Sequence, residues 1–297
     1  MPRDTLQLLL LIRHPRPAMT AECGIISNSL ILFGRPFGRC HMFQHNLQQD
    51  FSWKAASNWL LLTFLAGSVN AGGFLACQRF VTHVTGFATL FGIDAARGRW
   101  DIAVGILSVP AFFLLGSFVA TLLVDRKIRH PRPPRYALVM GLVTLCLVGA
   151  ALGGYFNLFG EFGHPVRLKQ DYFFLALLCS ASGLQNTTIT LSSNFSVRTT
   201  HLTGTTTDLG ISLARFFVVH AARARQRDEQ EAMWLKGGTI AAFAAGSAVG
   251  ALLFMRVHYL GFLMPAAISL YAMILALPSP RGALKFFEVL RRGGSPP

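Results

Sequence analysis

Charged residues are scarce in this chain, and the acidic ones are the scarcest. Asp, Glu, Lys and Arg make up 13% of the 297 residues, and only 13 are Asp or Glu, whereas a soluble domain usually has about 25% charged residues. Stretches of 19 or more residues lack charge entirely, and such a stretch can cross a bilayer as a helix. They exclude an ordinary water-soluble domain. Six spans are predicted, at Asn58–Cys77, Ile102–Val124, Tyr136–Phe159, Tyr172–Thr190, Gly237–Met255 and Tyr259–Leu277.

Catalytic and metal-binding motifs are also absent. The five cysteines form no C-x-x-C pair and no Cys/His cluster with zinc spacing, so no disulfide framework is indicated. The sequence contains no G-x-S-x-G, P-loop or H-E-x-x-H motif, which are signatures of hydrolases, nucleotide-driven proteins and metalloproteases. We therefore expect no enzyme, no metal, no cofactor and no ATP-driven pump.

The basic residues are numerous but unevenly placed. Of the 27 Lys and Arg, 15 lie between spans two and three, between spans four and five, and after span six, whereas six lie in the alternate connections. Because cytoplasmic loops are enriched in Lys and Arg, both termini are predicted to lie in the cytoplasm, with the protein in a bacterial inner membrane. The net charge of +14 then reflects topology, and no nucleic-acid partner is expected.

The two ends of the chain differ from the membrane part. Residues 1–41 have no helical or strand period and no apolar run of span length. They are predicted to be a disordered extension or a start-site artefact, with Met42 as an alternative start. The membrane domain is expected at 42–280, followed by a basic cytoplasmic tail at 281–297.

An internal repeat is the most informative feature. THVTGFATLFGI begins at Thr82 and THLTGTTTDLGI begins at Thr200, and these two motif blocks share seven of twelve residues. The similarity continues upstream, where AGSVNAGGF (66–74) parallels SGLQNTTI (182–189). Downstream, FLLGSFVATLL (113–123) parallels FAAGSAVGALL (243–253). Repeats set the architecture of a chain, so repeat one is predicted at about 55–160 and repeat two at about 171–280.

Each repeat contains three predicted spans, an odd number, which would place the second repeat upside down relative to the first. Inverted repeats build many secondary transporters, whose sites lie near the bilayer midplane between the halves. The predicted fold is an all-α integral membrane protein with six transmembrane helices in two inverted three-span repeats, each with a short polar motif helix.

The residues shared by the two blocks recur at helical spacing, on one face of each motif helix. Two interpretations remain open. Small and hydroxyl-bearing faces allow tight packing between membrane helices. Alternatively, the helices are discontinuous, and their amino ends, capped by Thr85 and Thr203, direct free N–H groups at an anion. His83 and His201 are likewise either buried histidines bonded to threonine or parts of a pathway.

The second block is the more polar one, and its Arg198 and Asp208 could pair with each other, or one could meet a substrate. Otherwise, this segment simply emerges into the cytosol. Asn70 and Asn186, at matching positions, could bond freed backbone or line a cavity. The predicted substrate-binding residues are Asn70, Thr82, His83, Thr85, Gly86, Thr89, Gln185, Asn186, Arg198, Thr200, His201, Thr203, Gly204, Thr207 and Asp208.

SGLQN at 182–186 together with VRTTHLTGTTTDLG at 197–210 resembles the YoaK-type family of bacterial multi-pass membrane proteins, over roughly residues 55–280. That family has no established biochemical role, so the resemblance implies a fold and a membrane location. Relatives typically have Asp where Asn70 stands and Asn where Phe87 stands, so the resemblance carries no carboxylate or amide role to these two positions.

These observations predict a secondary transporter or permease for a small solute, and an anion would suit the motif helices. The alternative is a non-transporting membrane protein that binds a partner or lipid through its basic cytoplasmic loops. The expected partners are the lipid bilayer and a small-molecule solute, and no oligomeric state follows from the sequence.

Overall fold

The computed structural model describes residues 53–129, 133–164, 169–218 and 223–277. The chain divides into two compact units, and all of these residues belong to the unit Arg39–Pro280. The predicted extension at 1–41, the alternative start Met42 and the basic tail at 281–297 lie outside the described residues. Every regular element of the described part is a helix, which confirms the all-α class.

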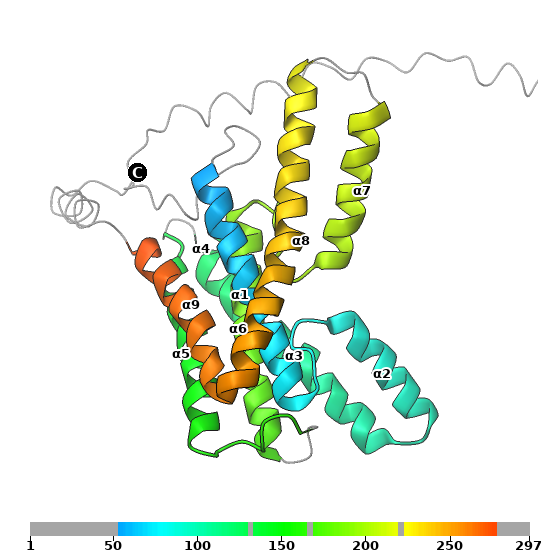
Figure 1. Cartoon of the computed structure of the whole chain (residues 1–297), viewed down its shortest axis with the longest axis vertical. Coiled ribbons are helices and arrows are strands. Elements are labelled where there is room, and N and C mark those ends of the chain that lie inside the picture. The colour runs from blue at the N-terminus through cyan, green and yellow to red at the C-terminus, as the bar shows by residue number, and fades with distance from the viewer. Residues whose placement is uncertain (1–52, 130–132, 165–168, 219–222, 278–297) are drawn as a thin grey trace, which may run out of the picture. The chain divides into compact units, whose positions relative to one another are not determined.

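The helices follow the apolar runs and the motif blocks in chain order (Figure 1). They are α1 (Trp53–Cys77), α2 (Val84–Ala96), α3 (Trp100–Val124), α4 (Arg126–Arg129), α5 (Tyr136–Tyr155), α6 (Lys169–Ser192), α7 (Leu202–Val218), α8 (Arg223–Val257), the 3₁₀ helix η2 (His258–Phe262) and α9 (Leu263–Ala276). The run predicted to extend to Phe159 ends as a helix at Tyr155, because Asn157 adopts a left-handed backbone with φ of 57°.

Length and composition identify membrane-spanning candidates among these helices. Four stretches are long and apolar enough to cross a bilayer: α1, α3, α5 and the segment Glu229–Ala276, which joins most of α8 to η2 and α9. Apolar side chains also face outward from them, as with Leu114, Leu115 and Phe118 of α3, each more than half exposed. An outward apolar surface suits lipid rather than water. The chain is therefore a helical membrane protein.

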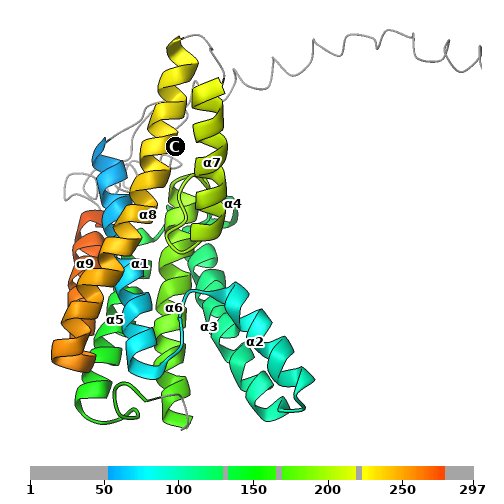
Figure 2. The same ribbon diagram turned by 45° about the vertical axis from the view of Figure 1, so that its right-hand side comes forward.

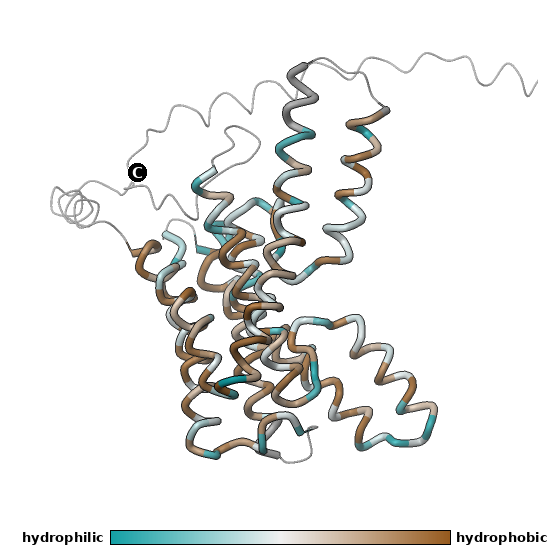
Figure 3. The backbone as a smooth tube through the Cα atoms, viewed as in Figure 1, coloured by the Kyte–Doolittle hydropathy of each residue, from teal (hydrophilic) through white to brown (hydrophobic). Residues whose placement is uncertain are grey.

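Helix α8 is longer than a bilayer requires. Its 35 residues correspond to about 52 Å at 1.5 Å per residue, against a hydrocarbon thickness of about 30 Å. Figure 3 shows hydrophilic residues on the part of α8 that runs beside α7, whereas the rest of the helix is mostly hydrophobic. The extra length therefore lies at the α7 end.

Helices from the two halves of the sequence pair with each other. Helix α1 packs along α8, and α3 packs along α6, so each pair joins a helix of the first half to a helix of the second half. Helix α5 packs against α6 and α9. The motif helices pack within their own repeats, α2 on α3 and α7 on α8, as two hairpins (Figures 1 and 2).

Glycines bring the backbones of these two helix pairs into close contact, and they do so at matching positions. A methyl group on Gly67 of α1 would overlap the carbonyl oxygen of Phe243 in α8. The matching Gly183 of α6 stands in the same relation to Phe113 of α3. Only glycine permits this approach, which small residues commonly provide between membrane helices.

Side-chain bonds repeat at the same crossings. The Ser247 hydroxyl donates to the Gly67 carbonyl at 3.1 Å, and the Ser117 hydroxyl donates to the Gly183 carbonyl at 3.5 Å. Ser117 and Ser247 occupy matching places in the downstream repeat segments. The sequence similarity between the halves is therefore matched by similar contacts.

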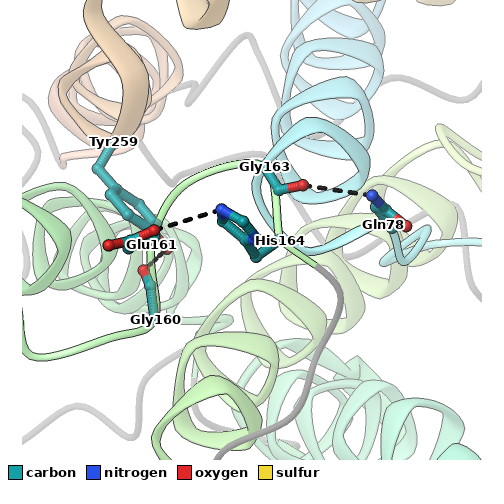
Figure 4. A network of polar contacts seen from close by, with 6 residues as sticks. All are labelled: Gln78, Gly160, Glu161, Gly163, His164 and Tyr259. Atoms are coloured by element: carbon teal, nitrogen blue, oxygen red, sulfur yellow. Dashed lines mark hydrogen bonds and ion pairs between the residues drawn. The ribbon is translucent and has the colours of Figure 1, made fainter.

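A polar network fixes the α5–α6 connection to its neighbours (Figure 4). The Tyr259 hydroxyl of η2 donates to the Gly160 carbonyl at 2.7 Å, and the Gln78 side chain, just after α1, donates to the Gly163 carbonyl at 3.2 Å. His164 and Glu161 lie 3.3 Å apart on the exposed side. The connection thereby links three parts of the chain that are distant in sequence.

Candidate functional site

Each motif block is anchored by the asparagine that precedes it in the same repeat. The Asn70 side-chain oxygen accepts from the Thr82 amide at 3.3 Å and from the Thr82 hydroxyl at 2.9 Å. The Asn186 oxygen accepts from the Thr200 amide and from the Thr199 hydroxyl, both at 3.3 Å. The prediction that these amides bond freed backbone is therefore confirmed.

A sharp turn after α1 and α6 makes this anchoring possible. Gln78, directly after α1, has φ of 55°, and Asn194 and Phe195, after α6, have φ of 49° and 64°. Left-handed residues commonly end helices, and here they turn the chain back along the helix it has just left. The motif blocks consequently begin beside the last two turns of the preceding helices.

The motif helices begin one residue after the histidine of each block. Helix α2 starts at Val84 with His83 in the capping position but without a side-chain capping bond, and α7 starts at Leu202, after His201. The prediction that Thr85 and Thr203 cap these helices is wrong, because both lie one position inside the first turn. The anchored Thr82 and Thr200 fix the chain two residues earlier, so the helix starts before either predicted cap.

The imidazoles fold over the glycines of their own blocks. A methyl group on Gly86 would lie 2.8 Å from Nδ1 of His83, and one on Gly204 would overlap the His201 ring. Neither ring makes a bond to a threonine side chain within the described residues, and both histidines are exposed. The interpretation as buried histidines is therefore wrong for both.

The amino ends of α2 and α7 line one pocket of about 550 Å³, which we call the motif pocket. In Figures 1 and 2 the first turns of these two helices are the ends that approach each other, although the helices themselves are not in contact. The predicted site residues that line the pocket are Thr82, His83, Thr85, Asn186, Arg198, Thr200, His201 and Thr203. Both motif helices therefore line this pocket, and they do so through their amino ends.

The pocket is lined by residues whose backbone amides are free. They are the amides of Val84 and Thr85 in α2 and of Leu202 and Thr203 in α7. Within the described part of the chain, none of the four donates to an acceptor in a turn or loop. All four residues line the pocket. The first amides of a helix have no partner inside the helix, and together with the helix dipole they place partial positive charge at its amino end.

The pocket is lined by one basic and one acidic side chain, Arg198 and Asp125. Arg198 is exposed and its Nη1 lies 3.5 Å from Nδ1 of His201. On the other wall stands Asp125, whose Oδ1 accepts from the Lys127 amide at 2.8 Å. The positive charge of Arg198 therefore lies beside the start of α7, while the carboxylate lies at the end of α3.

Only part of the predicted face of each motif helix lines the motif pocket. Thr89 and Thr207 lie one turn beyond the pocket. Their hydroxyls donate to the carbonyls of Thr85 and Thr203, respectively. The glycines further along, Gly92 and Gly210, have nothing within 4 Å of where a methyl would be. Tight packing of this face is therefore not observed within the chain. Each helix packs through its other side, through Phe87 in α2.

Three further predicted residues lie outside the pocket. The side-chain oxygen of Asn70 accepts from the Thr82 hydroxyl. Gln185 is buried and donates to the carbonyl of Leu62 in α1. Asp208 does not pair with Arg198; ion pairs in the described ranges join Arg99 to Asp94, His164 to Glu161 and Arg215 to Glu229. The pairing fails because Arg198 precedes α7, whereas Asp208 lies nearly two turns into it.

Several pocket residues were missed by the sequence analysis. Thr121 of α3 and Asp125, directly after α3, line the pocket. Together with Ser117 they form a polar stripe at four-residue spacing at the end of an apolar helix. Such a stripe is a detectable signal, because polar residues in membrane helices usually face protein or a cavity. Phe195 also lines the pocket, through a left-handed backbone conformation for which the sequence gives no signal.

The two hairpins are closed by related contacts. Arg99 forms an ion pair with Asp94, a residue near the end of α2 that is buried. In the other hairpin, Lys236 donates to the buried Ser212 hydroxyl at 2.9 Å and to the Asp208 carbonyl at 3.3 Å. Asp94 and Ser212 directly follow their motif blocks. A basic side chain thus fixes α2 near its end and α7 near its middle.

The fold and the site together define a helical membrane protein with two motif hairpins, and the amino ends of both motif helices line one pocket. Over residues 59–275 the chain matches the family described as "Protein of unknown function (DUF1275)", and it belongs to that family. Neither the curated proteins nor the solved structures contain a match to it. Within the described residues, no group of three or more His, Cys, Asp or Glu is arranged to hold a metal ion.

Proposed function

We propose that this protein is a secondary transporter or permease for a small anionic solute, and that the motif pocket binds the solute. The observation that carries the proposal is the convergence of two helix amino ends, from two halves of the chain, on one pocket with four free amides. Helix amino ends bind anions through free N–H groups and the helix dipole. Arg198 adds a full positive charge beside them.

The size of the pocket suits a small molecule. Its volume of about 550 Å³ lies within the range of about 300–1,000 Å³ typical of ligand pockets. Hydroxyl and imidazole groups from both repeats supply further hydrogen-bond donors. The donors come from two helices and can surround an anion rather than contact it from one side.

The proposed architecture is two inverted repeats of three spans with both termini in the cytoplasm. It is supported by the matched crossings at Gly67 and Gly183, by the pairing of long helices from the two halves, and by the distribution of basic residues. In transporters with inverted repeats, broken helices direct their amino ends at anionic groups near the midplane. Helices α2 and α7 have the corresponding position within their repeats.

Proline substitution at the first helical position tests the role of the free amides. Proline is tolerated there because that amide has no intrahelical partner, so Val84→Pro and Leu202→Pro each remove one donor and retain the helix. Val84→Ala and Leu202→Ala are matched controls that keep the amide. Loss of a hydrogen bond to a charged group costs about 1.5–3 kcal/mol, which corresponds to a Kd about 10- to 100-fold weaker.

The assay is uptake into proteoliposomes, with a panel of inorganic anions and small carboxylates, together with thermal-shift binding of the same compounds. We expect Arg198→Gln and the proline variants to lose uptake while Thr207→Ala and Asp208→Asn, outside the pocket, retain it. Equal uptake by the proline and alanine variants would refute the anion site. Failure of every anion, combined with binding to vesicles rich in anionic lipid, would favour the non-transporting alternative.

A further inference from the structure

We propose that a second pocket and the motif pocket are the two ends of one solute path, and that the Phe87 ring closes the path between them. This inference rests on the proposed function. The second pocket, which we call the Asp101 pocket, has a volume of about 300 Å³. Its polar lining residues are Arg79, Asp101 and Tyr172.

The two pockets come close to each other along α3. Gly105 and Val109 line the Asp101 pocket, and Phe113 and Thr121, with Asp125 just after the helix, line the motif pocket. Val109 and Phe113 are four residues apart, so these two residues share a helix face. Between Val109 and Phe113 there is one turn, or about 6 Å along the helix axis.

Helix α6 shows the same order. Tyr172 and Leu175, near its start, line the Asp101 pocket, whereas Asn186 and Thr190, near its end, line the motif pocket. Since α3 and α6 pack along each other, the two pockets occupy successive levels of one interface. The linings of the two pockets come within one turn of each other on α3 and within about three turns on α6.

We assign the barrier between the two pockets to Phe87. Val84 and Thr85 of α2 line the motif pocket, and Phe87, the next residue but one, lines the Asp101 pocket. The Phe87 side chain is only 3% exposed, so its ring fills space where α2 packs on α3. No other α2 residue lines the Asp101 pocket.

The repeat provides an independent reason to assign this role to Phe87. The motif blocks are alike on either side, yet Phe87 corresponds to Thr205 in the second block. Thr205 is only partly buried, and its hydroxyl donates back to the His201 carbonyl at 3.0 Å. A bulky plug is thus present in one repeat, and a small residue stands at the matching place in the other.

The charged groups of the Asp101 pocket suit an entrance. Arg79 is half-buried and Asp101 is exposed, and within the described ranges neither takes part in an ion pair. A solute leaving water can therefore contact polar groups before it reaches the apolar level of Ile106 and Val109. Phe87 lines the pocket together with these two residues.

Cysteine accessibility tests the path without knowledge of the solute. In a background with the native cysteines replaced by alanine, Thr121→Cys reports on the motif pocket and Ile102→Cys on the Asp101 pocket. The protein is reconstituted in vesicles of known orientation and treated with a membrane-impermeant thiol reagent from either side. With Phe87 present, we expect each reporter to react from its own side only.

Phe87→Ala should make Thr121→Cys reactive from the Asp101 side as well. A minor open state is typically populated at about 0.1–10%, so removal of the ring should raise this labelling rate by about tenfold or more. Phe91→Ala is the matched control, since Phe91 lies on the same helix, packs against the same core and lines neither pocket. If Phe87→Ala does not fold, Phe87→Thr, which introduces the residue found in the second block, is the test variant in its place.

Unchanged labelling in folded Phe87→Ala or Phe87→Thr overturns the proposal, as does an equal increase in Phe91→Ala. The outcome is separable from the anion site. Labelling across the barrier without anion uptake would support the path and reject the proposed solute. Anion uptake without such labelling would support the proposed solute and reject the path.

Discussion

Replacement of Gly67 by alanine tests the close helix crossings most directly. The added methyl would overlap the carbonyl oxygen of Phe243, a backbone atom that cannot rotate away, so α1 and α8 must separate. Overpacking of this kind costs about 1–3 kcal/mol, and a backbone obstacle places Gly67→Ala at the upper end. Alanine regains about 1 kcal/mol of helix propensity over glycine. The net destabilisation is therefore about 2 kcal/mol.

Gly92→Ala is the matched control. It lies in helix α2, where nothing stands within 4 Å of the new methyl, so only the gain in helix propensity of about 1 kcal/mol applies. For a chain of this size 1 kcal/mol corresponds to about 2–4 °C in Tm. We expect Gly67→Ala to lower Tm by about 4–8 °C and Gly92→Ala to raise it by about 2–4 °C.

Thermal unfolding in detergent, followed by tryptophan fluorescence, measures both changes. Gly183→Ala should behave like Gly67→Ala, because its methyl would overlap the Phe113 carbonyl at the matching crossing. Gly210→Ala should behave like Gly92→Ala, because its surroundings are equally open. A Gly67→Ala protein with the Tm of the wild type, or a Gly92→Ala protein as damaged as Gly67→Ala, would refute this reasoning.

Three further predictions follow from the anchors, the topology and the chain end. Asn70→Ala should lower stability by about 1–3 kcal/mol, because the Thr82 amide and hydroxyl lose their acceptor. Asn70→Asp should retain both bonds. An equal loss of stability in thermal unfolding for the two variants would contradict this role. Reporter fusions after Arg129 and Arg225 should be cytoplasmic and one after Arg167 periplasmic, and a periplasmic signal at Arg225 would reject the inverted topology. A protein that begins at Met42 should insert and melt like the full chain, and a large fall in Tm would show that residues 1–41 pack on the membrane part.

The local elements were predictable from the sequence. Uncharged runs of span length marked the long helices, because hydrocarbon accepts such segments only as helix or closed barrel. The spacing of the shared residues marked α2 and α7 as helices. The matching positions of Asn70 and Asn186 suggested a backbone anchor, which the bonds to Thr82 and Thr200 confirm.

The partners of those elements were decided by tertiary structure alone. Helical periodicity shows which residues share a face, but it does not show what covers that face. The face of Thr89 and Gly92 is retained between the blocks and yet is open, while the opposite side, with Phe87, is buried. Conversely, Gly67 meets Phe243 across more than 170 residues of chain, and only the packing of α1 along α8 brings them together.

The site itself combines both levels. The sequence determined that two polar blocks of the same composition exist, each with a histidine, threonines and a glycine. The tertiary structure decided that their amino ends, rather than their whole faces, meet in one pocket, and it added Asp125 of α3 to the wall. The physical reason is the anchoring asparagine, which holds each block beside the last two turns of a long helix. The packing of α1 with α8 and of α3 with α6 then brings the two anchored ends to one pocket.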